Sequence, residues 1–292
     1  MTRLFLRLAP ALLLLAAAPP TPVARPALWK LADADTTIWL FGTVHVLPAN
    51  YRWRGPMIDR AIAGSQSLTL ETILDEEPGR VATALMTLGR AKGLPPLAER
   101  VPAGRREALA ALVKQSGVPM EVLDGMKTWA AAVLLTGPAL SRIALAGGWG
   151  QGVEPQLTAT FRQSVRPVLG LETPEQQLGY FDALPEASQR TFLAETVEPA
   201  ADAGDDFQRM LRAWSKGDVA AIERAFAEDP EFTPALRDLL VVRRDRLWAD
   251  ALAARLEKPG TVFVAVGAGH LAGPDSVQRM LAAKGFRVTR VQ

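Results

Sequence analysis

The sequence contains no cysteine, and this absence excludes several classes of site. Disulfides, thiolate zinc sites, iron–sulfur clusters, a lipobox and cysteine catalysis all need a thiol. Histidine is nearly as scarce, so any site built on imidazole has only His45 and His270 to use. For an exported chain, the lack of unpaired thiols fits the periplasm of a Gram-negative cell.

Long apolar runs are also rare, and the clearest one stands at the N-terminus. Arg3 and Arg7 precede an apolar run over residues 8–18 that is broken only by Pro10 and ends in alanines. This arrangement is typical of a secretory signal peptide, which we place at residues 1–24, with an uncleaved anchor as the alternative. No later run is long enough to span a membrane. We therefore expect a periplasmic protein whose mature form has no transmembrane helix.

The chain beyond the leader has no excess of either charge. Without Arg3 and Arg7, 31 basic residues face 31 acidic ones, and no basic patch is interleaved with aromatic residues. This balance argues against a nucleic-acid partner. An apolar content of 49% in 292 residues is ample for a core. We expect residues 25–292 to form a single domain.

Short apolar strands alternate with helical stretches along most of the chain. Between about residues 79 and 147 the pattern is helical only, with Leu and Ala at three- and four-residue spacing. A further long amphipathic helix is expected over 233–257. The alternation predicts an α/β fold in which a mixed central sheet has helical cover and a large helical insertion at about 79–147.

Both histidines stand in the same local frame. An apolar strand leads into Gly42 and then His45, and another leads into Gly267 and then His270, with two residues between glycine and histidine each time. A glycine just past a buried strand lets the chain turn sharply or approach a ligand closely. Ligands bind at the carboxyl ends of strands in open α/β sheets. A lone histidine is usually a satisfied core residue, but the shared frame favours a functional role here.

Two glutamates repeat the pattern, because Glu71 and Glu172 both occur in the frame Leu-x-Leu-Glu-Thr at the end of a short apolar strand. Glu172 also fits an ordinary helix start, where an acidic residue simply faces the helix dipole. The order His, Glu in the first half and Glu, His in the second suggests two related βα halves that face one another.

These motifs together resemble the TraB/GumN family over nearly all of the mature chain. That family includes the Tiki proteins, described as metal-dependent proteases, and plasmid proteins that suppress peptide pheromones. The resemblance implies a fold similar to erythromycin-esterase-like and ChaN-like proteins, and an active site made of His45, Glu71 and His270. The segments that carry it are 41–45, 70–71, 171–177 and 266–274.

The sequence departs from the family pattern in one place. The long helix before the second Gly-x-x-His usually carries an Arg-Asn pair, and here it reads Arg243-Arg244-Asp245-Arg246. We match Arg243 with the arginine of the pair and regard Arg244 as a replacement of the asparagine. Without the resemblance, Arg243 and Glu154 would be assigned to solvated surfaces.

Three functions fit this residue set. His45, Glu71 and His270 form an N/O ligand set that suits a divalent ion such as Mn, Co or Zn, which predicts a metal-dependent hydrolase acting on a peptide or small-molecule substrate. In that scheme Glu172 is a further candidate for the general base. The second function is a metal-free hydrolase of the esterase type, with His45 as base, Glu71 orienting it and Arg243 holding an anion. The third is a binding protein for haem or another ligand, without chemistry.

Overall fold

The computed structural model describes residues 24–73, 78–147, 149–198, 203–228 and 232–292. The expected leader, residues 1–24, lies outside these ranges except for its last residue. Within the described residues, no helix combines the length and the apolar character that crossing a membrane requires.

A six-stranded mixed sheet forms the centre of the described residues, in the strand order β6-β4-β7-β2-β1-β8. The four neighbouring strands from β6 to β2 run parallel, while β1 pairs antiparallel with β2 and with β8. The mixed central sheet expected from the sequence is thus confirmed. The strands are β1 (Leu28–Ala32), β2 (Thr36–Thr43), β4 (Ser67–Leu70), β6 (Val168–Gly170), β7 (Gly260–Gly267) and β8 (Val288–Arg290).

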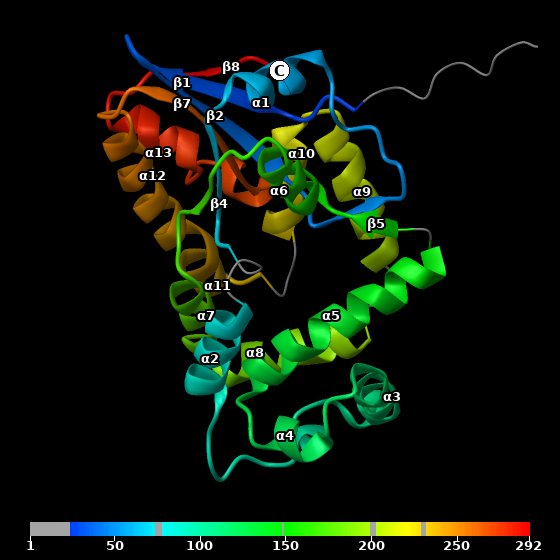
Figure 1. The fold of residues 1–292 in the computed structure, drawn as a ribbon. Coiled ribbons are helices and arrows are strands. Elements are labelled where there is room, and N and C mark those ends of the chain that lie inside the picture. The colour runs from blue at the N-terminus through cyan, green and yellow to red at the C-terminus, as the bar shows by residue number, and fades with distance from the viewer. Residues whose placement is uncertain (1–23, 74–77, 148, 199–202, 229–231) are drawn as a thin grey trace, which may run out of the picture.

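Helices cover both faces of this sheet (Figure 1). On one face, α1 (Pro56–Gly64) and α6 (Val153–Gln163) share a buried apolar cluster with Phe263 and Ala265 of β7. On the other, α12 (Arg243–Arg255) and α13 (Val277–Ala283) share a second cluster with the valines that alternate with those residues along β7. Because successive side chains of a strand point to opposite faces, a strand buried on both faces is apolar throughout.

The helices that follow β4 gather on one side of the molecule, away from the sheet (Figure 1). Their apolar side chains form two clusters of their own, one around Leu109, Leu135 and Leu193 and one around Trp129. The helices are α2 (Pro78–Gly89), α3 (Arg106–Ser116), α4 (Met120–Asp124), α5 (Thr128–Gly147) and α8 (Glu186–Val197). Between them and the sheet lies α7 (Pro174–Asp182), which starts with the capping box of Thr173 and Gln176 that its sequence predicts.

The chain differs from the sequence expectation at two connections. The glycines just before Val153 are typical of a flexible hinge, yet β5 (Trp149–Gln151) pairs there with β3 (Val46–Pro48) as a small antiparallel sheet. Proline is common at the first position of a helix, which predicts a last helix from Pro274. The helix instead begins at Val277, because Pro274 lies in a turn that Ser276 closes by donating to the Gly273 carbonyl.

The long helix expected over 233–257 is interrupted by a wider turn. It consists of α11 (Pro234–Arg237), a π-helical turn over Asp238–Val242 and α12. A π-helical turn closes its hydrogen bonds one residue later than an α-helix does, so it rotates everything that follows relative to regular helical spacing. Before this helix come α9 (Ala203–Ser215) and α10 (Val219–Glu228), which pack on the same face of the sheet as α1 and α6.

Candidate active site

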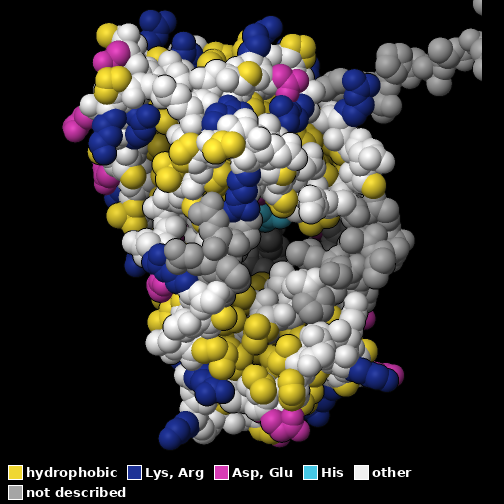
Figure 2. Space-filling view, viewed as in Figure 1, with side chains coloured by type: hydrophobic (Ala, Val, Ile, Leu, Met, Phe, Trp, Pro, Cys, Tyr) yellow, Lys and Arg dark blue, Asp and Glu magenta, His cyan; other side chains and the backbone are white. Residues whose placement is uncertain are grey.

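Four ionisable side chains follow the four parallel strands at their carboxyl ends. Across the sheet they are Glu172 after β6, Glu71 after β4, His270 after β7 and His45 after β2. Both histidines follow strands of the same sheet and lie at the same edge of it, because β2 and β7 pair in parallel. Figure 2 shows a histidine side chain inside a hollow of the molecular surface.

The glycines of the two Gly-x-x-His motifs allow close approach of other groups. A Cβ atom on Gly42 would lie 3.1 Å from the Cα atom of Ala268, so the first motif is in contact with the second. A Cβ atom on Gly267 would lie 3.1 Å from Oε1 of Glu71, and the Gly267 N–H donates to that oxygen at 2.7 Å. Any larger residue at either position would push the loops or the carboxylate apart.

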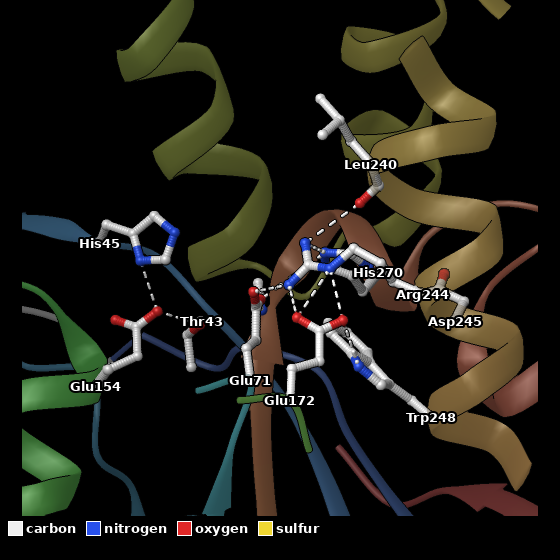
Figure 3. A network of polar contacts seen from close by, with 11 residues as sticks. Thr43, His45, Glu71, Glu154, Glu172, Leu240, Arg244, Asp245, Trp248 and His270 are labelled. Atoms are coloured by element: carbon white, nitrogen blue, oxygen red, sulfur yellow. Dashed lines mark hydrogen bonds and ion pairs between the residues drawn. The ribbon is translucent and has the colours of Figure 1, made fainter. Parts of the chain in front are cut away.

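His45 is held by a carboxylate that comes from α6. Its Nδ1 lies 2.7 Å from Oε1 of Glu154, and the same oxygen accepts a hydrogen bond from the Thr43 hydroxyl at 2.6 Å. Glu154 reaches this place because Gly152 lies against the backbone of His45, where a Cβ atom would collide with the carbonyl oxygen. The His45 side chain is 75% exposed, and Figure 3 shows its other ring nitrogen turned toward the side where Glu71 and Arg244 lie.

Arg244 forms the centre of a second group of contacts, shown in Figure 3. Its Nη2 donates to Oε2 of Glu71 at 2.7 Å and to Oε2 of Glu172 at 2.9 Å. Its Nε donates to Glu172 at 2.9 Å, and the Trp248 indole N–H also donates to Glu172 at 2.9 Å. Because the Glu172 side chain is only 3% exposed, the guanidinium supplies the counter-charge that a buried carboxylate requires.

His270 has both ring nitrogens engaged. Arg244 Nη1 lies 3.3 Å from Nε2, and since a guanidinium can only donate, Nε2 is the acceptor. The ring proton is therefore on Nδ1, which lies 2.6 Å from Oδ1 of Asp245 and donates to it. Trp248 packs against the ring with 4.5 Å between centroids. The His270 side chain is 10% exposed, in contrast to His45.

Burial and these contacts shift the acidities of the group. Burial alone would raise the pKa of Glu71, but the Arg244 guanidinium and the Gly267 N–H outweigh burial and lower that pKa. Burial raises the pKa of Asp245 to about 6, despite its hydrogen bond with His270. At His45, the hydrogen bond with Glu154 raises the pKa to about 9. Glu71 is thus firmly ionised at neutral pH, while Asp245 is much easier to protonate than an ordinary aspartate.

The structure places Arg243 outside this group and Arg244 inside it. Arg243 is 60% exposed and pairs with Asp238 at 2.7 Å. The residues of α12 that face the strand ends are Arg244 and Asp245, so the arginine in this group is Arg244 rather than Arg243.

Two partner carboxylates are the main residues that sequence reasoning missed or underrated. Glu71 was expected to orient His45, but Glu154 does so. Asp245 was not singled out, because it stands in a run of charged residues that is typical of a solvated helix face, whereas its side chain is fully buried. For Glu154 the sequence did contain a signal, namely the glycines before it. Gly152 lets the chain pass close to the His45 backbone, which places the first turn of α6 beside His45.

The expected metal ligands do not meet at one point in this arrangement. His270 and Glu71 are neighbours, with 3.8 Å between Nε2 and Oε1, but both face Arg244, and His45 is bound to Glu154 instead. Among the described residues, no three His, Asp or Glu side chains are grouped so that they could hold one ion. As placed, the set does not fit a metal, and the metal stays a prediction.

The chain matches the TraB/PrgY/gumN family model over residues 27–290. The chain belongs to this family. It is also similar to the uncharacterized protein YbaP of Escherichia coli K12, at 25% identity over 185 residues that cover 63% of this chain and 67% of YbaP. The corresponding protein of Shigella flexneri gives the same values. No solved structure matches the chain.

Proposed function

We propose that this protein is an extracytoplasmic hydrolase of a peptide or ester, in which His45 acts as general base and Glu154 orients it. The observation that carries the proposal is the His45–Glu154 pair, which leaves one imidazole nitrogen without a partner among the described residues, on an exposed ring. The leader-like N-terminal sequence supports export to the periplasm. The proposal includes the erythromycin-esterase/ChaN-like fold that the family resemblance implies.

The chemistry follows from the two ends of the His45 ring. Nε2 takes a proton from a water molecule while the water oxygen attacks the substrate carbonyl, and the proton then passes to the leaving group. Nδ1 stays hydrogen-bonded to Glu154, whose carboxylate stabilises the imidazolium that forms between the two transfers. Glu154 is suited to this because burial, which would raise its pKa, is outweighed by the hydrogen bond with His45, so its pKa is lowered.

Arg244 does not serve as an anion clamp in this scheme. A guanidinium has five N–H donors, and here all of them point to protein acceptors: Glu71, Glu172, His270 and the Leu240 carbonyl. A substrate anion would have to displace one of these contacts. We therefore assign Arg244, Glu71 and Glu172 a structural role, in which their mutual hydrogen bonds fix the strand ends, rather than a role in binding substrate.

The test is hydrolysis by the purified exported chain of a fluorogenic peptide library and chromogenic esters, with EDTA and with added Mn²⁺, Co²⁺ or Zn²⁺. Hydrolysis that persists in EDTA and is lost in His45→Ala supports the proposal, with Arg243→Ala as an exposed control. Hydrolysis only with added ions would instead establish the metal-dependent alternative. A co-purified ligand, such as a haem absorbance band, without turnover would favour the binding function.

The pH profile gives a second readout that a purely structural role of Glu154 would not produce. Because His45 acts as a base only when deprotonated, and Glu154 raises its pKa to about 9, kcat/KM should rise with pH up to about that value. In Glu154→Gln the pKa should return toward its ordinary value of 6.5, so the rise should move to lower pH while the maximal rate falls. A profile with an unshifted rise would exclude His45 as the base.

A further inference from the structure

Three side chains of metal-ligand type converge on the end of one guanidinium. Nη2 of Arg244 lies 2.7 Å from a Glu71 oxygen and 2.9 Å from a Glu172 oxygen, and Nη1 lies 3.3 Å from Nε2 of His270. Each of these three atoms comes from the carboxyl end of a different parallel strand. The residues that surround Arg244 are therefore two carboxylates and one imidazole, which are ligand types of N/O metal sites. With Arg244 in place they are spread around the guanidinium and are not grouped so that they could hold one ion.

The other ring nitrogen of His270 and the second oxygens of the two glutamates are held by hydrogen bonds, as the corresponding atoms of metal ligands commonly are. His270 donates its Nδ1 proton to Asp245, the contact that commonly orients a metal-bound histidine. The second oxygen of Glu71 accepts the Gly267 N–H, and the second oxygen of Glu172 accepts the Trp248 N–H. Apart from Arg244 Nε, which also donates to that Glu172 oxygen, none of these outer contacts involves the guanidinium. These outer contacts orient one nitrogen and two oxygens toward the position that the Arg244 guanidinium occupies.

We propose that Arg244 is the resident cation of this ligand set, that it excludes a divalent ion from the wild-type protein, and that removing it creates a metal site formed by Glu71, Glu172 and His270. His45 takes no part, because its own partner is Glu154. The inference differs from the metal set expected from the sequence, which contained His45 and lacked Glu172. The exclusion of metal by Arg244 is also independent of the proposed hydrolysis, in which His45 is the base.

The experiment measures bound metal after dialysis against Mn²⁺, Co²⁺ or Zn²⁺, together with thermal melting. Wild type and the neighbouring exposed control Arg243→Ala should retain almost no metal and show no metal-dependent shift in Tm. Arg244→Ala should retain about one ion per chain, and the ion should raise its Tm. Adding His270→Ala to Arg244→Ala should abolish the binding, whereas adding His45→Ala should leave it intact.

Because Arg244→Ala leaves two buried carboxylates without a counter-charge, the variant is also refolded with and without Mn²⁺, in parallel with Arg244→Gln, which keeps more of the side-chain volume. Metal-dependent folding or binding in either variant supports the inference. It is overturned if neither variant gains metal binding or metal-dependent folding, or if the wild type holds one ion through His45. These outcomes are separate from the hydrolysis test, which reads the wild-type chain in EDTA.

Discussion

The two Gly-x-x-His motifs provide the same parts and use them differently. After β2, His45 has one nitrogen on Glu154 and a ring that is 75% exposed. After β7, His270 has one nitrogen on Asp245, the other on Arg244, and a ring that is 10% exposed. A shared frame therefore fixes where a histidine lies at the strand end, but not what it is free to do. The elements packed over each strand decide that: the first turn of α6 leaves His45 open, whereas α12 covers His270.

The largest expected effect separates the two histidines by activity and stability. His45→Ala should lower kcat/KM for the hydrolysed substrate by about 10²–10⁴, the usual contribution of a general base, with little change in the denaturation midpoint. His270→Ala should instead shift the midpoint, because it leaves Asp245 buried without its donor. The measurements are steady-state kinetics and urea denaturation of both variants. Equal losses of activity at unchanged stability would show that the comparison is wrong.

The next largest effect distinguishes two neighbouring arginines on one helix. Arg244→Ala should reduce the free energy of unfolding by about 3–5 kcal/mol, because it leaves the carboxylates of Glu71 and Glu172 without their counter-charge. Arg243→Ala removes an exposed ion pair with Asp238 and should change that free energy by no more than about 0.5 kcal/mol. Denaturant titration of the two variants beside the wild type measures both. Similar values for the pair would contradict the burial of Arg244.

A smaller effect tests the buried partner of His270 through pH. Burial raises the pKa of Asp245 to about 6 from an ordinary value of 3.8. A raised pKa means that the folded state binds the proton more tightly, so the contribution of this group to stability is full below pH 4 and is lost as pH rises through about 6. Asp245→Asn lacks the titration. The stability of the wild type relative to this variant should therefore fall between pH 4 and pH 7, by at most about 3 kcal/mol.

Denaturation curves of wild type and Asp245→Asn at several pH values between 4 and 7 give this difference directly. The neighbouring groups Glu71, Arg244 and His270 are common to both proteins. A difference that stays constant over this range would show that burial does not perturb Asp245.

Local patterns were enough to predict the strand ends and the residues on them. An apolar strand followed by glycine and histidine, or by glutamate, is readable from neighbouring residues, and the parallel order then brings His45, Glu71, Glu172 and His270 to one edge. The mixed sheet followed in the same way from alternating strands and helices. These features needed no knowledge of contacts between distant segments.

The partners of those residues depend on contacts that the local sequence does not encode. Asp245 stands in a charged run that is typical of a solvated surface, and only the packing of α12 on the sheet buries it. Arg243 was preferred to Arg244 because it was matched with the arginine of the family's Arg-Asn pair, and the charged run around it does not show which arginine is buried. Glu154 lies far from His45 in the chain, and the glycines before it indicate closeness to another backbone without saying which one.

The smallest expected effect concerns the exposed pair on the His45 side. Glu154 raises the pKa of His45 to about 9, so the pair stabilises the folded state below the ordinary pKa of 6.5, and this contribution is lost as pH rises through about 9. The lower limit is set by Glu154, whose lowered pKa keeps it ionised until the pH is well into the acid range. Since the His45 ring is largely exposed, water screens the interaction, and its contribution to stability should not exceed about 1 kcal/mol.

The measurement is the melting temperature of wild type against His45→Gln at pH 7 and at pH 10. Wild type should melt slightly higher at pH 7, and the two proteins should melt together at pH 10, where His45 is neutral in both states. A difference that survives at pH 10 would mean that His45 stabilises the fold by packing rather than by charge. In that case His45 would contribute to stability by packing, as the buried His270 does, and the two Gly-x-x-His motifs would differ less than the exposures of their histidines indicate.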